Sequence, residues 1–259
     1  MTNKIFSVIS ILLVTTLLFS GCNKNEDNPL NPGGGNDNDV NNSGQPIPTI
    51  LGTDGMMATI AFSYTFPGSP LSFDYVMGYA LLGLPSGVNA GAVSVNGNNI
   101  NFATGNGMNY YNSFSQTNPS SLSNVTFNGS QQHTWTVVGG NGVPAINDGL
   151  VAPNTFEITA PVSNSTITKT NALNVTWSNP TTTDSVMVVI VSLTGGTPYV
   201  SSLLPNNGSF TIPATSMTTL PLGDAMLEVV KFRYKIATVG SKSYAIIAEI
   251  VKVANVKLE

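Results

Sequence analysis

Charged side chains are scarce in this sequence of 259 residues: they make up 8% of the chain, against roughly 25% in soluble proteins generally. Lys and Arg are missing altogether between Lys24 and Lys169. Because contacts from basic residues to phosphate dominate the affinity for nucleic acids, their absence excludes nucleic-acid binding by the first half of the chain. Solubility must come from Asn, Ser, Thr and Gly instead, which suits a protein outside the cytoplasm.

Cysteine and histidine each occur once, as Cys22 and His133. A single cysteine cannot form a disulfide within the chain, and a lone histidine without a second His or a Cys offers no metal-ligand set. His133 lies two residues before Trp135 on an expected strand, and we interpret it as a structural residue. No spacing of Ser, His and Asp indicates a catalytic triad. The sequence therefore predicts no metal, no other cofactor and no enzymatic activity.

The cysteine has a distinctive context. The apolar run 5–19 begins after Lys4, and two small residues, Ser20 and Gly21, separate its end from the cysteine. A positive start, an apolar run of this length and small residues before a cleavage point indicate a secretory signal peptide, and the run is too short for a transmembrane helix. The stretch Phe19-Ser20-Gly21-Cys22 resembles the lipobox of bacterial lipoproteins, although Phe19 is bulkier than the Leu usual there. An ordinary cleaved signal with an incidental cysteine is the alternative.

The lipoprotein resemblance has consequences for processing and location. It implies a signal peptide at 1–21 and an anchor to membrane lipid through acylated Cys22. Asn23 rather than Asp follows the cysteine, which by resemblance to lipoprotein sorting favours the outer membrane, at its periplasmic face or at the cell surface. Glu26-Asp27 resembles the acidic export tags of Bacteroidota surface lipoproteins. Residues 22–45 are rich in Asn, Asp, Gly and Pro, and such a segment predicts a flexible tether.

Beyond the tether the sequence has the pattern of an all-β protein. Residues 57–66 alternate between the two faces of a strand, and Asn96-Gly97 between two apolar runs is a strong hairpin signal. Similar short segments recur at the spacing of antiparallel sandwiches. Polar and glycine residues followed by Pro153 mark a boundary. We therefore predict two tandem antiparallel β-sandwich domains, 46–152 and 153–259.

The second of these domains has a family resemblance. Ile158-Thr159-Ala160-Pro161, a strand ending at Trp177 and the hydrophobic strand 186–193 resemble bacterial immunoglobulin-like and fibronectin type III-like modules over roughly residues 156–259. The resemblance implies a sandwich with Trp177 buried, and it says almost nothing about function. Asp184-Ser185-Val186 also matches the short O-glycosylation motif of Bacteroidota exported proteins, which makes Ser185 a candidate glycosylation site.

Two groups of residues are candidates for ligand binding. Tyr110, Tyr111 and Phe114 lie among asparagines, a composition that can present aromatic platforms to sugar rings. Neighbouring residues of a strand point to opposite faces, so at least one of the two tyrosines is expected in the core.

The second group lies on the last hairpin. Lys231, Arg233 and Lys235 alternate with Phe232 and Tyr234, so the basic residues share one face of a strand. We interpret this face as a solvent-facing stripe, either a solvated surface or a site for an acidic partner. Its positive charge also allows it to attract the acidic first half of the chain.

Taken together, the sequence predicts a non-enzymatic, lipid-anchored binding or structural module that captures a surface glycan, another ligand or another surface protein. A fimbrial or adhesin subunit is the alternative, although the arginine that usually directs maturation in that family is missing before Arg233. A hydrolase is a further alternative, because a pair of carboxylates can hydrolyse glycosides without histidine. The carboxylates available for such a pair are Asp54, Asp74, Asp148 and Glu157.

Overall fold

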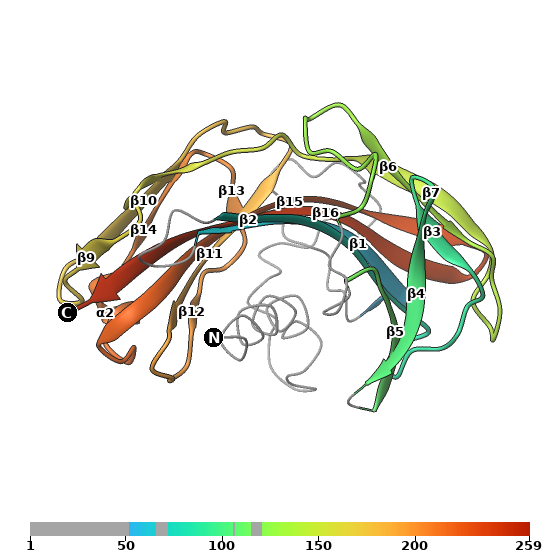
Figure 1. Cartoon of the computed structure of the whole chain (residues 1–259), viewed down its shortest axis with the longest axis horizontal. Helices are drawn as coiled ribbons and strands as arrows, with labels where there is room; N and C mark the ends of the chain where they lie inside the picture. The colour runs from blue at the N-terminus through green and yellow to red at the C-terminus, as the bar shows by residue number, and fades with distance from the viewer. Residues whose placement is uncertain (1–51, 66–71, 106, 115–120) are drawn as a thin grey trace.

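Two long strands, β15 (Gly223–Val239) and β16 (Lys242–Leu258), run through the whole molecule. They pair antiparallel along their full length, and Gly240, with a φ of 65°, supplies the left-handed conformation of the tight turn between them. At about 3.4 Å per residue, a strand of this length spans roughly 58 Å. The computed structural model (Figure 1) describes residues 52–65, 72–105, 107–114 and 121–259. The predicted signal peptide, Cys22 and the tether lie outside the described residues.

The predicted all-β class is confirmed. One sheet of 13 strands has the order β12-β11-β15-β16-β1-β2-β5-β4-β3-β6-β7, with β13 paired to β11 and β9 paired to β16. A second sheet has the order β14-β10-β8, and one short helix, α2 (Ala214–Met217), follows β14. In the first half of the chain the strands are β1 (Gly55–Thr65), β2 (Ser72–Leu82), β3 (Val93–Val95), β4 (Asn98–Gly105), β5 (Met108–Asn112), β6 (Gln132–Val137) and β7 (Ile146–Val151). In the second half they are β8 (Ile158–Ala160), β9 (Ser165–Ile167), β10 (Leu173–Trp177), β11 (Ser185–Ser192), β12 (Tyr199–Val200), β13 (Leu204–Pro205) and β14 (Ser209–Ile212).

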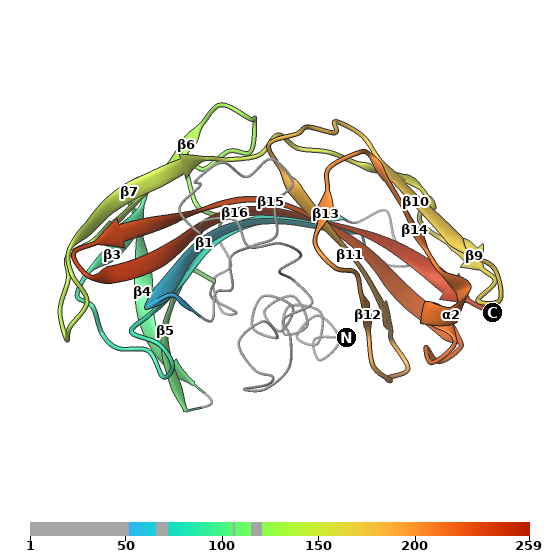
Figure 2. The same ribbon diagram turned by 180° about the vertical axis from the view of Figure 1, so that it is seen from behind.

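The long sheet is bent into an arch, and two outer layers cover its convex side (Figures 1 and 2). At one end the sheet turns back over itself through β3, β6 and β7, and their apolar side chains pack with Tyr244 and Ile246 of the hairpin. At the other end β10 and β14 pack on the same hairpin, where Trp177 and Ile212 meet Leu227 and Ile250. Trp177 is buried as predicted, and its ring nitrogen donates a hydrogen bond to Asn206 Oδ1 at 2.6 Å.

The concave side of the sheet carries its own apolar cluster. Successive side chains of a strand point to opposite faces. The residues that alternate with those packed under the two outer layers therefore face the inside of the arch. This concave cluster is rich in aromatic rings and also holds the carboxyl groups of Glu228 and Glu249, whose neighbours on their own strands belong to it. Its rings are Phe62, Tyr64, Tyr75, Tyr79, Tyr110, Phe114, Phe232 and Tyr234.

The predicted division into two separate sandwiches at residues 152 and 153 is not confirmed. The chain does build outer layers over two halves of the sheet, but β15 and β16 contribute core residues to both. In addition, β1 of the first half pairs parallel with β16 from Gly55↔Tyr244 to Ser63↔Lys252. The last hairpin therefore joins the two halves in one continuous sheet, instead of completing the second half alone.

Candidate functional site

The ladder beside β16 is interrupted near the middle of the molecule. Strand β1 follows the outer edge of β16 up to Ser63↔Lys252, and β9 takes up the same edge, also parallel, only from Ser165↔Val256. Among the described residues no strand pairs with this edge at Val253–Asn255. We call this interval the strand break. A pocket of about 340 Å³ lies at the strand break, within the size range of ligand sites in proteins.

The turn between β8 and β9 explains why β9 joins the edge of β16 only some residues beyond the end of the β1 pairing. After β8 the chain reaches Pro161, which has no backbone N–H to donate to a ladder. Ser165 then donates its backbone N–H to the Val162 carbonyl at 3.2 Å, and Asn164 takes up a φ of 70°. The Asn164 N–H bonds the Asn255 carbonyl at 2.6 Å, so the chain rejoins β16 only at the far end of the strand break.

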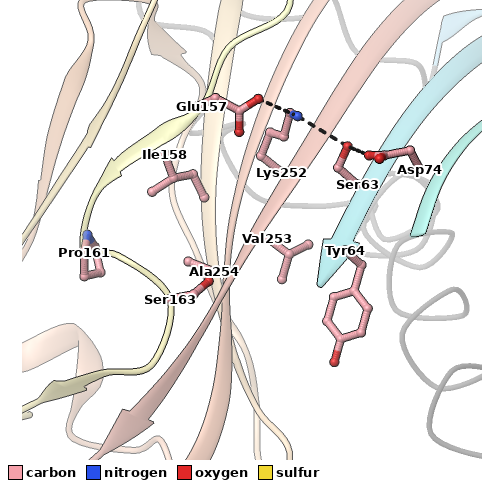
Figure 3. A pocket seen from close by; sticks show the side chains of 10 residues that line it. All are labelled: Ser63, Tyr64, Asp74, Glu157, Ile158, Pro161, Ser163, Lys252, Val253 and Ala254. Atoms are coloured by element: carbon pink, nitrogen blue, oxygen red, sulfur yellow. Dashed lines mark hydrogen bonds and ion pairs between the residues drawn. The ribbon is translucent and has the colours of Figure 1, made fainter. Parts of the chain in front are cut away.

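A row of four polar side chains crosses the convex side of the pocket (Figure 3). Lys252 is its centre: its Nζ lies 2.8 Å from Glu157 Oε1 and donates to Ser63 Oγ at 3.3 Å. Ser63 in turn donates to Asp74 Oδ1. The Lys252 side chain is 16% exposed, whereas that of Glu157 is 70% exposed. Three successive polar contacts thus connect the carboxylate of Glu157 to that of Asp74.

The remaining walls of the pocket include aliphatic side chains. Ile158, Pro161, Val253 and Ala254 line it, and Tyr64 stands at the end of β1 with its ring directed away from the polar row (Figure 3). Burial raises the pKa of the Tyr64 phenol. Ser163 adds a further hydroxyl, so the surface that the pocket presents to a ligand is mainly polar, with aliphatic side chains at its edges.

Two of the four carboxylates that the sequence offered for hydrolysis line this pocket, and the other two lie elsewhere. Asp74 and Glu157 belong to the polar row, whereas Asp148 pairs with Lys235 at 2.5 Å and Asp54 pairs with Lys242 at 3.7 Å. Sequence reasoning missed Ser63 and gave Lys252 no role. The available signal was a lysine, three residues after Glu249, in a strand that is otherwise largely apolar from Tyr244 to Val253.

The candidate aromatic residues divide between the two faces, as strand alternation predicts. Tyr111 is buried in the convex core, where its hydroxyl accepts a hydrogen bond from the Ala90 N–H at 2.7 Å and donates to the Gly91 carbonyl at 2.8 Å. Tyr110 and Phe114 are half-buried at the border of the concave cluster. Tyr110 stacks on Tyr79 with centroids 5.8 Å apart, and Phe114 meets Tyr75 edge to face at 5.3 Å. These rings are not part of the pocket at the strand break.

The basic residues of β15 share one face, as predicted, but the prediction of a solvent-facing stripe is wrong. Lys231 is fully buried: its Nζ lies 5.1 Å from the centroid of the Phe156 ring and donates to the Asn179 carbonyl at 3.2 Å. Burial lowers its pKa to about 8. Arg233 bonds buried Asp184 at 2.7 Å and Lys235 bonds Asp148, leaving side-chain exposures of 20% and 21%. The face is covered because the chain between the two halves crosses it.

The candidate glycosylation site is also inside the fold. Ser185 is fully buried at the start of β11, where it lies opposite Phe232 in the ladder. A glycan on its hydroxyl is incompatible with this position, so the structure argues against Ser185 as an attachment site.

His133 is buried, as its interpretation as a structural residue requires. Its Nδ1 lies 2.7 Å from Thr59 Oγ1 and its Nε2 lies 3.0 Å from the Thr126 carbonyl. Burial lowers the pKa of the imidazole. Across the described ranges, no group of three or more His, Cys, Asp or Glu side chains is placed to hold a metal ion.

Two comparisons of this chain with known proteins gave no match. No protein-family model matches it, and no curated protein matches it significantly. Within the described part of the chain, no helix is long and apolar enough to cross a membrane.

Proposed function

We propose that this protein is a non-enzymatic, lipid-anchored binding module at the outer membrane or cell surface, and that it captures a glycan in the pocket at the strand break. The observation that carries the proposal is the combination there of aliphatic walls and a fixed row of two carboxylates, a lysine and a serine. Sugars present hydroxyl groups and apolar ring faces, and these groups match such a surface. The immunoglobulin-like assignment of the second half belongs to the same proposal.

The hydrolase alternative draws on the same two carboxylates. A glycosidase needs one carboxyl that holds a proton to donate to the leaving group. Glu157 accepts instead from the Lys252 ammonium, and Asp74 accepts from the Ser63 hydroxyl. Lys252, as the charged partner of Glu157, also has no free electron pair with which to activate Ser63 as a nucleophile. Binding without turnover is therefore the better account.

Capture is tested by titrating the purified protein with neutral oligosaccharides in a calorimeter, beside a variant that combines Asp74→Asn and Glu157→Gln. We expect the parent to bind and the variant to bind roughly tenfold or more weakly, since two charge-assisted acceptors are lost. Asp224→Asn, which changes an exposed carboxylate on β15 outside the pocket, is the matched control and should bind as the parent does. Equal affinity of all three proteins would contradict the site, and shortened sugar products would favour the hydrolase.

The anchor is tested separately. If Cys22 is acylated, Cys22→Ala should move the protein from the detergent-soluble membrane fraction to the soluble fraction and should abolish incorporation of labelled fatty acid. Ser20→Ala keeps a small residue before the cysteine and serves as the control. A Cys22→Ala protein that stays in the membrane and still carries the label would refute the lipoprotein assignment.

A further inference from the structure

We propose that the pocket at the strand break selects its ligand by charge: it binds sugar units that carry an ammonium group most tightly, neutral units less tightly, and it rejects units that carry a carboxylate or a sulfate. This inference rests on the proposed function, because it specifies the ligand of the same pocket. It follows from the free hydrogen-bonding groups of the polar row and from the charges around it.

The polar row leaves more acceptors than donors for a ligand. Glu157 uses Oε1 for Lys252, and Asp74 uses Oδ1 for Ser63, so with respect to the described residues each carboxylate keeps a second oxygen (Figure 3). The Ser63 hydroxyl has a single hydrogen to donate, and it donates this hydrogen to Asp74. Lys252 has already directed two of its three N–H groups to Glu157 and Ser63. A ligand that supplies donors, as hydroxyl and ammonium groups do, is therefore matched better than one that supplies only acceptors.

The charges around the pocket point the same way. Two carboxylates face one ammonium, so the polar row carries a net negative charge. The other lining elements, from β1, β2, β8 and the turn after β8, lie within the part of the sequence between Lys24 and Lys169 that contains no basic residue. Lys252 is the one basic residue among the described residues that line the pocket, and it is already paired with Glu157. A ligand carboxylate would therefore meet the like charges of Glu157 and Asp74, which repel it.

Glu157 is the residue on which the selection depends most. It lies directly before β8, its side chain is largely exposed, and it forms an ion pair with Lys252. Glu157→Gln removes one negative charge and leaves the Lys252 ammonium without its ionic partner. Adding Asp74→Asn makes the polar row net positive. We therefore expect the double variant to reverse the preference and to bind an acidic sugar better than an amino sugar.

The test compares three probes by calorimetry at low ionic strength: an oligomer of glucosamine, an oligomer of glucose and an oligomer of galacturonic acid. For the parent we expect affinity to fall in that order, by on the order of tenfold between the first probe and the last, and the difference to shrink in high salt. For the double variant we expect the reverse order. Asp224→Asn should keep the parent's order, which excludes a general effect of net charge.

Each outcome has a distinct meaning. A parent protein that binds the galacturonate oligomer as tightly as the neutral one overturns the charge selection while leaving sugar capture in place. A protein that binds none of the three probes contradicts the proposed function as well. The parent's order of affinities and its salt dependence decide the matter even if the double variant fails to fold, since they need no substitution.

Discussion

Replacing Lys231, Arg233 and Lys235 together with glutamate is expected to abolish folding. The substitution puts negative charges beside Asp184 and Asp148, which now bond Arg233 and Lys235, and it inserts a carboxylate where Lys231 is fully buried. Breaking a buried ion pair costs about 3–5 kcal/mol, and the whole fold of a typical domain is stable by only about 5–15 kcal/mol. The purified variant should lack a cooperative thermal transition and dispersed amide signals.

Two further variants show whether the loss of stability comes from burying a negative charge or merely from changing the charge of a basic residue. Lys257→Glu changes an exposed lysine on the same hairpin and should alter stability by less than about 1 kcal/mol. Lys231→Met keeps the apolar stem and removes the charge, and it should be tolerated far better than Lys231→Glu. A triple glutamate variant with the thermal midpoint of the parent would mean that the basic face is open to solvent.

The protein is expected to lose stability as the pH rises from about 5 to about 8, because of two carboxyl groups in the concave cluster. Glu228 lies between Val189 and Val253 in the ladder, and Glu249 lies between Phe232 and Ile60. Both side chains are buried, and neither oxygen of Glu228 has a hydrogen-bond partner among the described groups. Burial raises the pKa of Glu228 to about 7, and burial together with the charge of Glu228 raises that of Glu249 to about 8.

The direction follows from proton binding. The unfolded chain releases these protons near pH 4.5, whereas the folded chain keeps them until about pH 7 and 8. Between these limits the folded state binds more protons than the unfolded state, so the free energy of unfolding falls as the pH rises and levels off above about 8. Each unit of pKa shift corresponds to about 1.4 kcal/mol, which places the total loss for the two carboxyl groups on the order of 6–8 kcal/mol.

Glutamine at both positions should remove this dependence. Urea unfolding of the parent and of the variant combining Glu228→Gln and Glu249→Gln, measured from pH 5 to pH 8.5, gives the difference directly. The lowered pKa of His133 acts in the opposite direction below about pH 6.5, and that of Lys231 acts above about pH 8, and both contributions cancel in the comparison. Parallel pH profiles for the two proteins would show that the carboxyls are solvated or paired.

Sequence periodicity predicted local features of this fold well. The Asn96-Gly97 turn joins β3 to β4 with both residues at positive φ, Tyr110 and Tyr111 point to opposite faces, and the basic residues of β15 share one face. Each of these follows from the two-residue repeat of a strand or from the conformations that a turn permits. The same repeat could not reveal that Lys231 is buried, because alternation says which side chains share a face and not what covers that face.

The pairing of strands that are far apart in the chain could not be predicted from the sequence. The strand break exists because β1 and β9, far apart in the chain, both pair with β16 and leave Val253–Asn255 between them. No local pattern encodes that register, so Ser63, Asp74, Glu157 and Lys252 could not be grouped in advance. The charge distribution gave a partial indication: three of the four ion pairs formed by described residues join the C-terminal hairpin to acids of residues 52–157, namely Asp54, Asp148 and Glu157.

Mapping the bound ligand on the protein tests the central claim most directly. Amide and side-chain NMR signals of the purified protein are followed while the glucosamine oligomer is added. The account predicts that the perturbed signals cluster at the strand break, on Tyr64, Glu157 and Lys252–Ala254. Perturbations centred instead on Tyr110 and Phe114, or no saturable perturbation with any sugar, would contradict it.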